Sequence, residues 1–250
     1  MSRLIQVRDV KFRLWPILLA AVIMQLCLIP ARELARWIYH QNTELLSGHV
    51  WAFVGMAILF QALSGLLGIM VMRHFLPEAD SHLRWPPARS YVGLAIVVGI
   101  SMGVIMLLAD YGPDIVSQTA PQAAYNTDLS GALGWLTVMM STGLAEETIF
   151  RGLLVGMLVV LVPGRIKIGR IDLPIAAYIV GILFAVAHYH SFIVDPLHLA
   201  IAQQLYAFIW CLVYVWLMER SRSLLAPIVA HGFGNAVEVG LVILMMRAWG

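Results

Sequence analysis

Three stretches of the chain, far apart in sequence, place acidic, basic and amide side chains inside otherwise apolar runs. These side chains are Glu146, Glu147, Arg151, His188, His231 and Asn235. A charged group at the centre of a bilayer costs about 2.5–3.5 kcal/mol on insertion scales, so its presence in such a run indicates function. A carboxylate can take a proton from water, while an imidazole or an amide can stabilise charge on an attacked carbonyl oxygen. The set therefore predicts a hydrolytic site.

Helix geometry predicts different roles for the adjacent acids Glu146 and Glu147. Neighbouring residues on a helix of about 3.6 residues per turn point about 100° apart. Glu147 and Arg151 are four residues apart and share a face, so we expect an ion pair between them. Glu146 points elsewhere, and we expect it to face a watered cavity. The alternative for Glu147 and Arg151 is an ion pair that only locks two helices together.

The second stretch, Phe184-Ala-Val-Ala-His188, ends a predicted helix that is rich in glycine and alanine and can pack closely. A single histidine in an apolar helix is more often a hydrogen-bonded core residue than a catalyst. The functional interpretation of His188 therefore depends on the other two stretches. His190 and His198 lie nearby, and we interpret both as interfacial residues without a role in the site.

The third stretch, His231-Gly-Phe-Gly-Asn235, places His231 and Asn235 on one helical face, with Glu238 one turn further on. A polar stripe of this kind faces protein or water, because lipid cannot satisfy it. Asn235 can donate a hydrogen bond to a developing oxyanion. Glu238 would either tune His231 through a hydrogen bond or satisfy a buried donor, and we favour the second interpretation.

A metal ion is a weaker prediction than hydrolysis. Histidine and carboxylate ligands suit zinc with an open position for water, so zinc is the candidate cofactor and its ligands are left open. The sequence lacks HExxH, and the adjacent Glu146 and Glu147 cannot easily point at one metal from an undistorted helix. A serine nucleophile is disfavoured, since GxSxG is absent and neither Ser130 nor Ser141 has an obvious histidine partner.

The composition predicts the elements that position these groups. Of the 250 residues, 61% are hydrophobic and 12% are charged, whereas soluble domains carry about 25% charged residues. Lipid is the natural solvent for this apolar excess. No basic run suggests nucleic-acid binding, and Cys27 and Cys211 are expected to be reduced core thiols because both lie inside apolar runs.

Seven apolar runs are long enough to be transmembrane helices, which need roughly 20 residues. The runs are 14–30, 50–72, 91–110, 129–162, 173–190, 197–218 and 224–249. The fourth exceeds one simple crossing, and a break near Arg151 would give eight helices. We therefore expect an all-α, polytopic transmembrane bundle of seven to eight helices around a polar cavity. It would form a single integral membrane domain over residues 1–250, with a motif-bearing catalytic core at about 131–242.

Basic residues alternate between the ends of these runs and predict an orientation. They gather before the first run, where Arg3 and Arg8 lie, and in the segments 73–89, 165–170 and 220–222. The positive-inside rule then places the N-terminus in the cytoplasm, and the short loops favour a bacterial inner membrane. No cleavable signal peptide is expected. In this scheme His188 lies at a different depth from Glu146, unless a break near Arg151 or a re-entrant stretch at 189–196 brings them level.

Taken together and in this order, the three stretches resemble the motifs of the CAAX protease and bacteriocin-processing (CPBP) family over roughly residues 131–242. The resemblance implies an intramembrane endopeptidase with about eight helices around a conical cavity. By analogy, Glu146 activates water, His188 assists it, and His231 with Asn235 stabilises the oxyanion, while Glu147 and Arg151 hold the site in shape. The family is often labelled as metalloproteases, although members are also described as glutamate-dependent without a catalytic metal.

The resemblance leaves the substrate open among prenylated CAAX proteins, bacteriocin-like peptides and membrane-anchored sorting tails. The expected partner is thus a membrane-associated peptide or protein in the lipid bilayer, and no nucleic acid. Two other classes remain as alternatives. One is a carrier or channel with an intramembrane glutamate and histidine proton path, for which inverted repeats would be expected. The other is a non-catalytic peptide-immunity protein.

Overall fold

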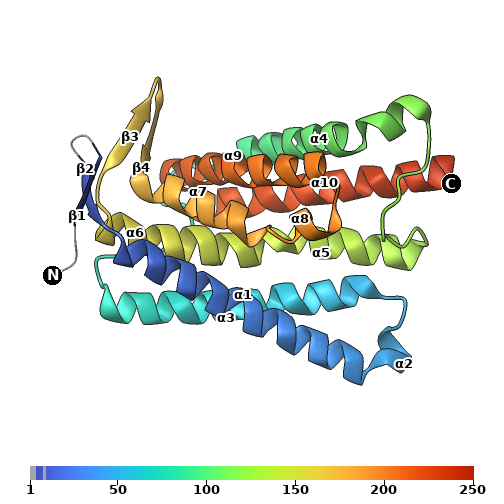
Figure 1. Ribbon diagram of the computed structural model, residues 1–250, viewed down its shortest axis with the longest axis horizontal. Helices are drawn as coiled ribbons and strands as arrows, with labels where there is room; N and C mark the ends of the chain where they lie inside the picture. The colour runs from blue at the N-terminus through green and yellow to red at the C-terminus, as the bar shows by residue number, and fades with distance from the viewer. Residues whose placement is uncertain (1–3, 8–9) are drawn as a thin grey trace.

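Helices form most of the protein in the computed structural model, which describes residues 4–7 and 10–250 (Figure 1). The helices are α1 (Trp15–Gln41), α2 (Thr43–Leu46), α3 (Val50–Phe75), α4 (Val92–Ser117), α5 (Leu129–Glu147), η1 (Thr148–Val155), α6 (Gly156–Leu161), α7 (Ile175–Ala187), α8 (Ser191–Val194), α9 (Leu197–Ser221) and α10 (Leu225–Trp249). Six helical segments are long and apolar enough to cross a membrane. The predicted all-α polytopic bundle is confirmed.

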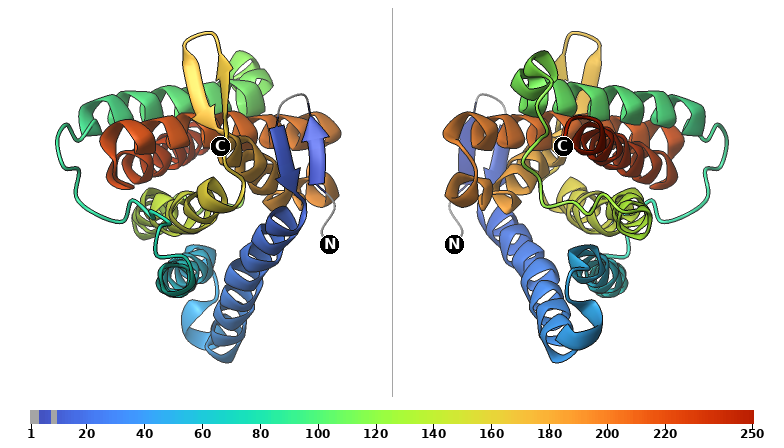
Figure 2. Two further views of the ribbon diagram at one scale, coloured as in Figure 1. Left: turned by 90° about the vertical axis from the view of Figure 1, so that its left-hand side faces the viewer. Right: turned by 90° about the vertical axis from the view of Figure 1, so that its right-hand side faces the viewer.

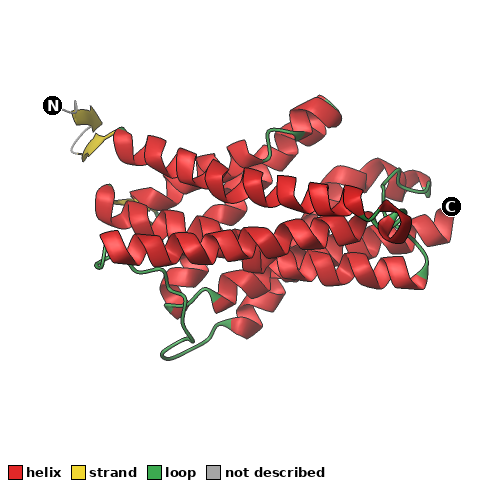
Figure 3. Cartoon of the chain, turned by 90° about the horizontal axis from the view of Figure 1, so that it is seen from below, coloured by secondary structure: helices red, strands yellow, loops and turns green. Residues whose placement is uncertain are grey.

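The run α5–η1–α6 lies in the middle of the bundle, with α1 and α3 on one side and α4, α9 and α10 on the other (Figures 1 and 2). Helix α10 packs against α4 and α5, while α3 packs against α1 and α5. The strands β1 and β2 and the C-terminus lie at opposite ends of the bundle (Figure 3). The central run therefore contacts both sides and is the natural place for a site between them.

Two short antiparallel hairpins were not predicted, and the second of them overlaps the start of the expected run 173–190. Strand β1 (Leu4–Val7) pairs with β2 (Val10–Arg13), and β3 (Arg165–Ile168) pairs with β4 (Ile171–Pro174). Both hairpins lie at the same end of the bundle (Figure 1). The basic loops after α3 and α9 are also joined, since Arg84 Nε donates to the Arg222 carbonyl at 3.1 Å. Arg3 and Arg8 lie outside the described residues.

One predicted helix end was wrong, because a proline did not end the helix. The first run was expected to end at Pro30, yet α1 continues through it to Gln41. The third was expected to end at residue 110, and the backbone does leave the helical conformation at Tyr111, although α4 resumes beyond this kink and continues past Pro113 to Ser117. Proline removes only one hydrogen bond, and lipid strongly favours keeping the remainder of the backbone helical. As a consequence, Arg32 lies inside a helix and not in a loop.

The expected break near Arg151 is a change of helix type and not an interruption. Residues 148–155 form η1, a π-helix of eight residues between α5 and α6. A π-helical turn closes i→i+5 hydrogen bonds and is frequent at functional sites. The extra residue in each turn rotates the side chains that follow it. The single break that would have given eight helices is therefore absent from this run.

Candidate active site

Close crossing of α5 and α10 brings the acidic pair next to His231. A Cβ atom on Gly143 of α5 would lie 2.4 Å from the Ile228 carbonyl oxygen, and one on Gly232 of α10 would lie 2.3 Å from that of Met140. Real Cβ atoms do not approach backbone atoms so closely, so only glycine fits at both positions. The two backbones therefore touch one turn before Glu147 and directly after His231.

Glu147 lies on a side of this crossing that is closed to solvent. Its Oε2 atom is 3.1 Å from Arg151 Nε, and both side chains are completely buried. The predicted ion pair is thus confirmed. The other carboxylate oxygen, Oε1, is 2.7 Å from His231 Nδ1. The guanidinium of Arg151 also lies over the rings of Phe184 and Tyr214, 4.6 and 4.9 Å from their centroids, where cation–π attraction stabilises it.

The contact with Glu147 determines how the imidazole of His231 is oriented. An ionised carboxylate can only accept a hydrogen bond, so Nδ1 of His231 carries a proton and donates the hydrogen bond to Glu147. The opposite nitrogen, Nε2, then faces Glu146, whose Oε2 atom is 3.7 Å away. Tyr214 of α9 stacks on the imidazole with ring centroids 5.1 Å apart and planes at 15°. His231 is therefore held on one edge and one face while Nε2 stays available.

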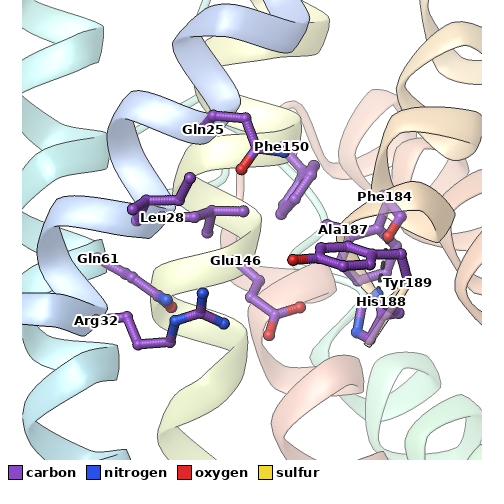
Figure 4. A pocket seen from close by; sticks show the side chains of 11 residues that line it. Gln25, Leu28, Arg32, Gln61, Glu146, Phe150, Phe184, Ala187, His188 and Tyr189 are labelled. Carbon is purple, nitrogen blue, oxygen red and sulfur yellow. Dashed lines mark hydrogen bonds between the residues drawn. The ribbon is translucent and has the colours of Figure 1, made fainter. Parts of the chain in front are cut away.

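Glu146 occupies the boundary between two cavities. The smaller, of about 160 Å³, lies between α1, α3, η1 and α7 and is shown in Figure 4. The larger, of about 210 Å³, lies among α4, α5, α9 and α10. The side chain of Glu146 is 24% exposed, against none for Glu147. The expectation that Glu146 faces a cavity is thus confirmed.

His188 lines both of these cavities with Glu146. Its Nδ1 atom lies 2.8 Å from the Phe184 carbonyl oxygen, which can only accept, so Nδ1 carries the proton and Nε2 is the free acceptor. Gln204 of α9 donates to the His188 carbonyl at 3.2 Å. The end of α7 is thereby fixed, and the imidazole presents a basic nitrogen.

The predicted difference in depth between His188 and Glu146 was wrong. Helix α7 was expected over 173–190 but ends at Ala187 after 13 residues, and the one-turn helix α8 follows. At 1.5 Å per residue, His188 lies about 20 Å from the hairpin end of the bundle. Glu146 lies at a similar depth, because η1 and α6 separate it from the same end. Both side chains line the same two cavities, so they lie at the same level.

Asn235 lines the larger cavity together with Glu146, His188 and His231. Its Nδ2 atom donates to Thr142 Oγ1 at 2.8 Å. An amide nitrogen has two hydrogens, so the second remains free for another acceptor. Glu238 lines the same cavity but has no hydrogen bond to His231 within the described part of the chain. Neither of the roles considered for Glu238 is therefore seen.

The donor set does not fit a zinc site. No three side chains of the kind that bind metals are grouped to hold an ion within residues 4–7 and 10–250. Glu147 is engaged by Arg151 and His231, and Nδ1 of His188 by a backbone carbonyl. Nε2 of His188 and Nε2 of His231 stay free, but with Glu146 they do not form the group of three ligands that catalytic zinc takes. We derive no step through a metal.

Three residues that the sequence analysis did not single out complete the site. Thr142 orients Asn235, Tyr214 stacks on His231 and contacts Arg151, and Gln204 fixes the end of α7. Thr142 lies one turn before Glu146 on the same helix, so its proximity to Glu146 could have been foreseen. Tyr214 and Gln204 lie on α9, which carries none of the three motifs, and sequence reasoning had no means of finding them.

Comparison with known proteins gives one family match. Residues 128–237 match the model of the family described as type II CAAX prenyl endopeptidase Rce1-like. No match was found among the curated proteins or among the solved structures. The matched segment contains all six predicted site residues. It confirms the resemblance to the CAAX protease and bacteriocin-processing family that the motifs predicted, and it identifies residues 128–237 as an Rce1-like segment.

Proposed function

We propose that this protein is an intramembrane endopeptidase that hydrolyses a peptide bond of a membrane-associated peptide or protein, with Glu146 as the general base. The family match supports a peptidase acting in the membrane. The observation that carries the mechanism is that Glu146, His188, His231 and Asn235 line one cavity. A base, a second proton acceptor and two donors are thereby gathered around a space large enough for water and a peptide group.

In the proposed reaction, Glu146 takes a proton from a water molecule in the cavity as the water oxygen attacks the scissile carbonyl carbon. His188 accepts a hydrogen bond from the same water at Nε2 and orients its lone pair. The tetrahedral intermediate then breaks at its C–N bond. Glu146 returns the proton to the leaving nitrogen, so that one water is consumed and an acid and an amine are formed.

The negative charge that develops on the carbonyl oxygen is stabilised from the α10 side. Asn235 offers its free Nδ2 hydrogen, and His231 offers Nε2–H when it is protonated. The carboxylate of Glu147 accepts from Nδ1 on the opposite edge of the imidazole at 2.7 Å and fixes the orientation of the ring. Arg151 compensates the charge of Glu147 in turn. Glu147 and Arg151 are therefore positioning residues that do not touch the substrate.

We also propose that the hairpin end of the bundle faces the cytoplasm of a bacterial cell. The basic segments gather at this end, and positive charge favours the cytoplasmic side. The N-terminus would then be cytoplasmic. Cysteine labelling of single engineered positions at the β3–β4 turn and after α2 in intact cells tests this: only the second should react with an impermeant reagent. Labelling of the turn alone would reverse the assignment.

The experiment that tests the proposed function compares Glu146→Gln with a matched control, Glu238→Gln. Both remove a carboxylate that lines the larger cavity, but only Glu146 is assigned to catalysis. Purified proteins in lipid nanodiscs are incubated with a peptide library, and products are identified by mass spectrometry. Cleavage should be lost in Glu146→Gln and kept in Glu238→Gln. Equal cleavage by wild type and Glu146→Gln would reject the mechanism, and a proton flux without cleavage would favour a carrier.

A further inference from the structure

Arg32 of α1 lies across the smaller cavity from the proposed general base. The lining includes Arg32, Gln25 and Gln61 on the α1 and α3 side and Glu146 and His188 on the other. In Figure 4 the guanidinium of Arg32 points across the cavity toward the carboxylate of Glu146. Among the described residues that line this space, Arg32 is the single lysine or arginine. The wall opposite the catalytic residues is thus polar and positively charged.

The guanidinium of Arg32 is not occupied by another protein group. Its nearest acid is Glu33, with 3.8 Å between Arg32 Nε and Glu33 Oε1. Glu33 is engaged elsewhere, since Arg36 Nη1 donates to both of its carboxylate oxygens at 2.6 and 2.8 Å. No hydrogen bond of Arg32 is present within the described part of the chain, and 45% of its side chain is exposed. Its Nη hydrogens are therefore free to bind a ligand.

A carboxylate is the ligand that this arrangement fits. The planar fork of arginine donates two parallel hydrogen bonds to a carboxylate, and the amides of Gln25 and Gln61 offer further donors beside it. A negative group would otherwise be repelled by Glu146 and poorly solvated in this part of the bundle. A guanidinium placed opposite Glu146 therefore favours a negative group there over a neutral one.

We propose that Arg32 binds a carboxylate of the peptide substrate within a few residues of the scissile bond and thereby selects substrates. This proposal rests on the proposed endopeptidase function. Both the free C-terminus of a substrate and an acidic side chain carry the required group. Arg32 would be a specificity-determining residue contributed by a helix outside the Rce1-like segment at 128–237.

The test uses peptides that differ in one carboxylate. Each peptide cleaved by the wild type is made as the free acid and as the C-terminal amide, and with glutamate or glutamine at positions flanking the scissile bond. Cleavage is measured in nanodiscs of neutral lipid for wild type, Arg32→Gln and Arg32→Lys. Arg36→Gln is the matched control, because Arg36 lies one turn further along the same helix and does not line the cavity.

The wild type should cleave the carboxylate-bearing member of a pair at least tenfold faster in kcat/KM. Arg32→Gln should remove this preference while cleavage of the amide partner stays within a factor of two or three. Arg36→Gln should keep the preference, and Arg32→Lys should keep part of it. A preference for free acids over amides would show that Arg32 binds the C-terminal carboxylate of the substrate. A preference for glutamate over glutamine would show that it binds an acidic side chain. A preference that survives in Arg32→Gln would overturn the proposal.

A binding measurement separates failure of this inference from failure of the proposed function. Fluorescent acid and amide peptides are titrated against Glu146→Gln and against Glu146→Gln with Arg32→Gln. Even when the wild type cleaves none of the peptides, the carboxylate site is supported if Glu146→Gln binds the acid peptide more tightly than the amide and the added Arg32→Gln substitution removes this difference. Equal binding of acid and amide overturns it. Retention of phosphatidylglycerol through purification in an Arg32-dependent manner, with no difference between the peptides, would assign Arg32 to a lipid headgroup.

Discussion

Glu146 and Glu147 are neighbours in sequence but lie in two different regions of the molecule. On the Glu147 side, the carboxylate is completely buried and both oxygens face fixed positive or donating groups. On the Glu146 side, the carboxylate borders two cavities, and its Oε2 atom is 3.7 Å from His231 Nε2, beyond hydrogen-bond distance. A turn of about 100° along one helix is enough to separate a structural acid from an acid that is free to react.

The contrast shows how a membrane protein can hold a reactive carboxylate in place without pairing it. A buried charge needs partners, and Glu147 has Arg151 and His231 for that purpose. The aromatic rings of Phe184 and Tyr214 close the space around Arg151. These contacts immobilise the helix on which Glu146 lies, so Glu146 needs no ion pair of its own. We expect substitutions on the Glu147 side to lower stability and substitutions on the Glu146 side to lower activity.

The largest effect is expected for Glu146→Gln. General acid–base catalysis typically contributes about 10²–10⁴-fold, so kcat should fall by that factor while the thermal midpoint stays within a few degrees of wild type. The measurement is the initial rate of peptide cleavage alongside thermal unfolding in the same detergent. A large loss of stability in this variant would contradict the separation of the two sides.

Glu147→Gln should instead destabilise the protein. Removing one partner of a buried ion pair leaves the other charge uncompensated, at a cost of about 3–5 kcal/mol. The free energy of unfolding, measured by denaturant titration in mixed micelles, should fall by that amount. Arg151→Met should lower the free energy of unfolding by a similar amount. The double variant should lose less than the sum of the two, because neither charge is then left alone in the core.

Thr142→Val tests a weaker contact that orients a group on the reactive side. It removes the acceptor of the 2.8 Å hydrogen bond from Asn235 while keeping the side-chain shape. A hydrogen bond of this kind contributes about 0.5–1.5 kcal/mol, so kcat should fall about tenfold or less with KM little changed. Thr142→Ser, which keeps the hydroxyl, should retain the wild-type rate. A rate loss in both variants would point to packing instead.

Chelation should have the smallest effect. Among the described residues, no three side chains are grouped so that they could bind a metal ion. Cleavage should therefore persist after dialysis against a strong zinc chelator. Elemental analysis should find less than one zinc per chain in both wild type and Glu146→Gln. Loss of cleavage on chelation that zinc alone restores would show that a metal is required.

Much of the site could be predicted from the sequence, because the relevant spacings lie along single helices. Glu147 and Arg151 are four positions apart, as are His231 and Asn235, so the face that each pair shares follows from helix geometry alone. The apolar excess likewise requires lipid whatever the tertiary arrangement. The ends of helices were less predictable, since α1 passes through Pro30 and α7 stops before His188.

Only the tertiary structure decided which groups meet across helices. The glycine crossing of α5 and α10 places His231 against Glu147, and α9 brings Tyr214 onto the imidazole. The packing of α1 beside the central run places Arg32 in the wall of the cavity that Glu146 borders. Such contacts depend on interhelical packing between residues far apart in the chain, and no local pattern encodes them. Sequence thus determined which side chains could react, and packing determined which of them are held still and which are left free.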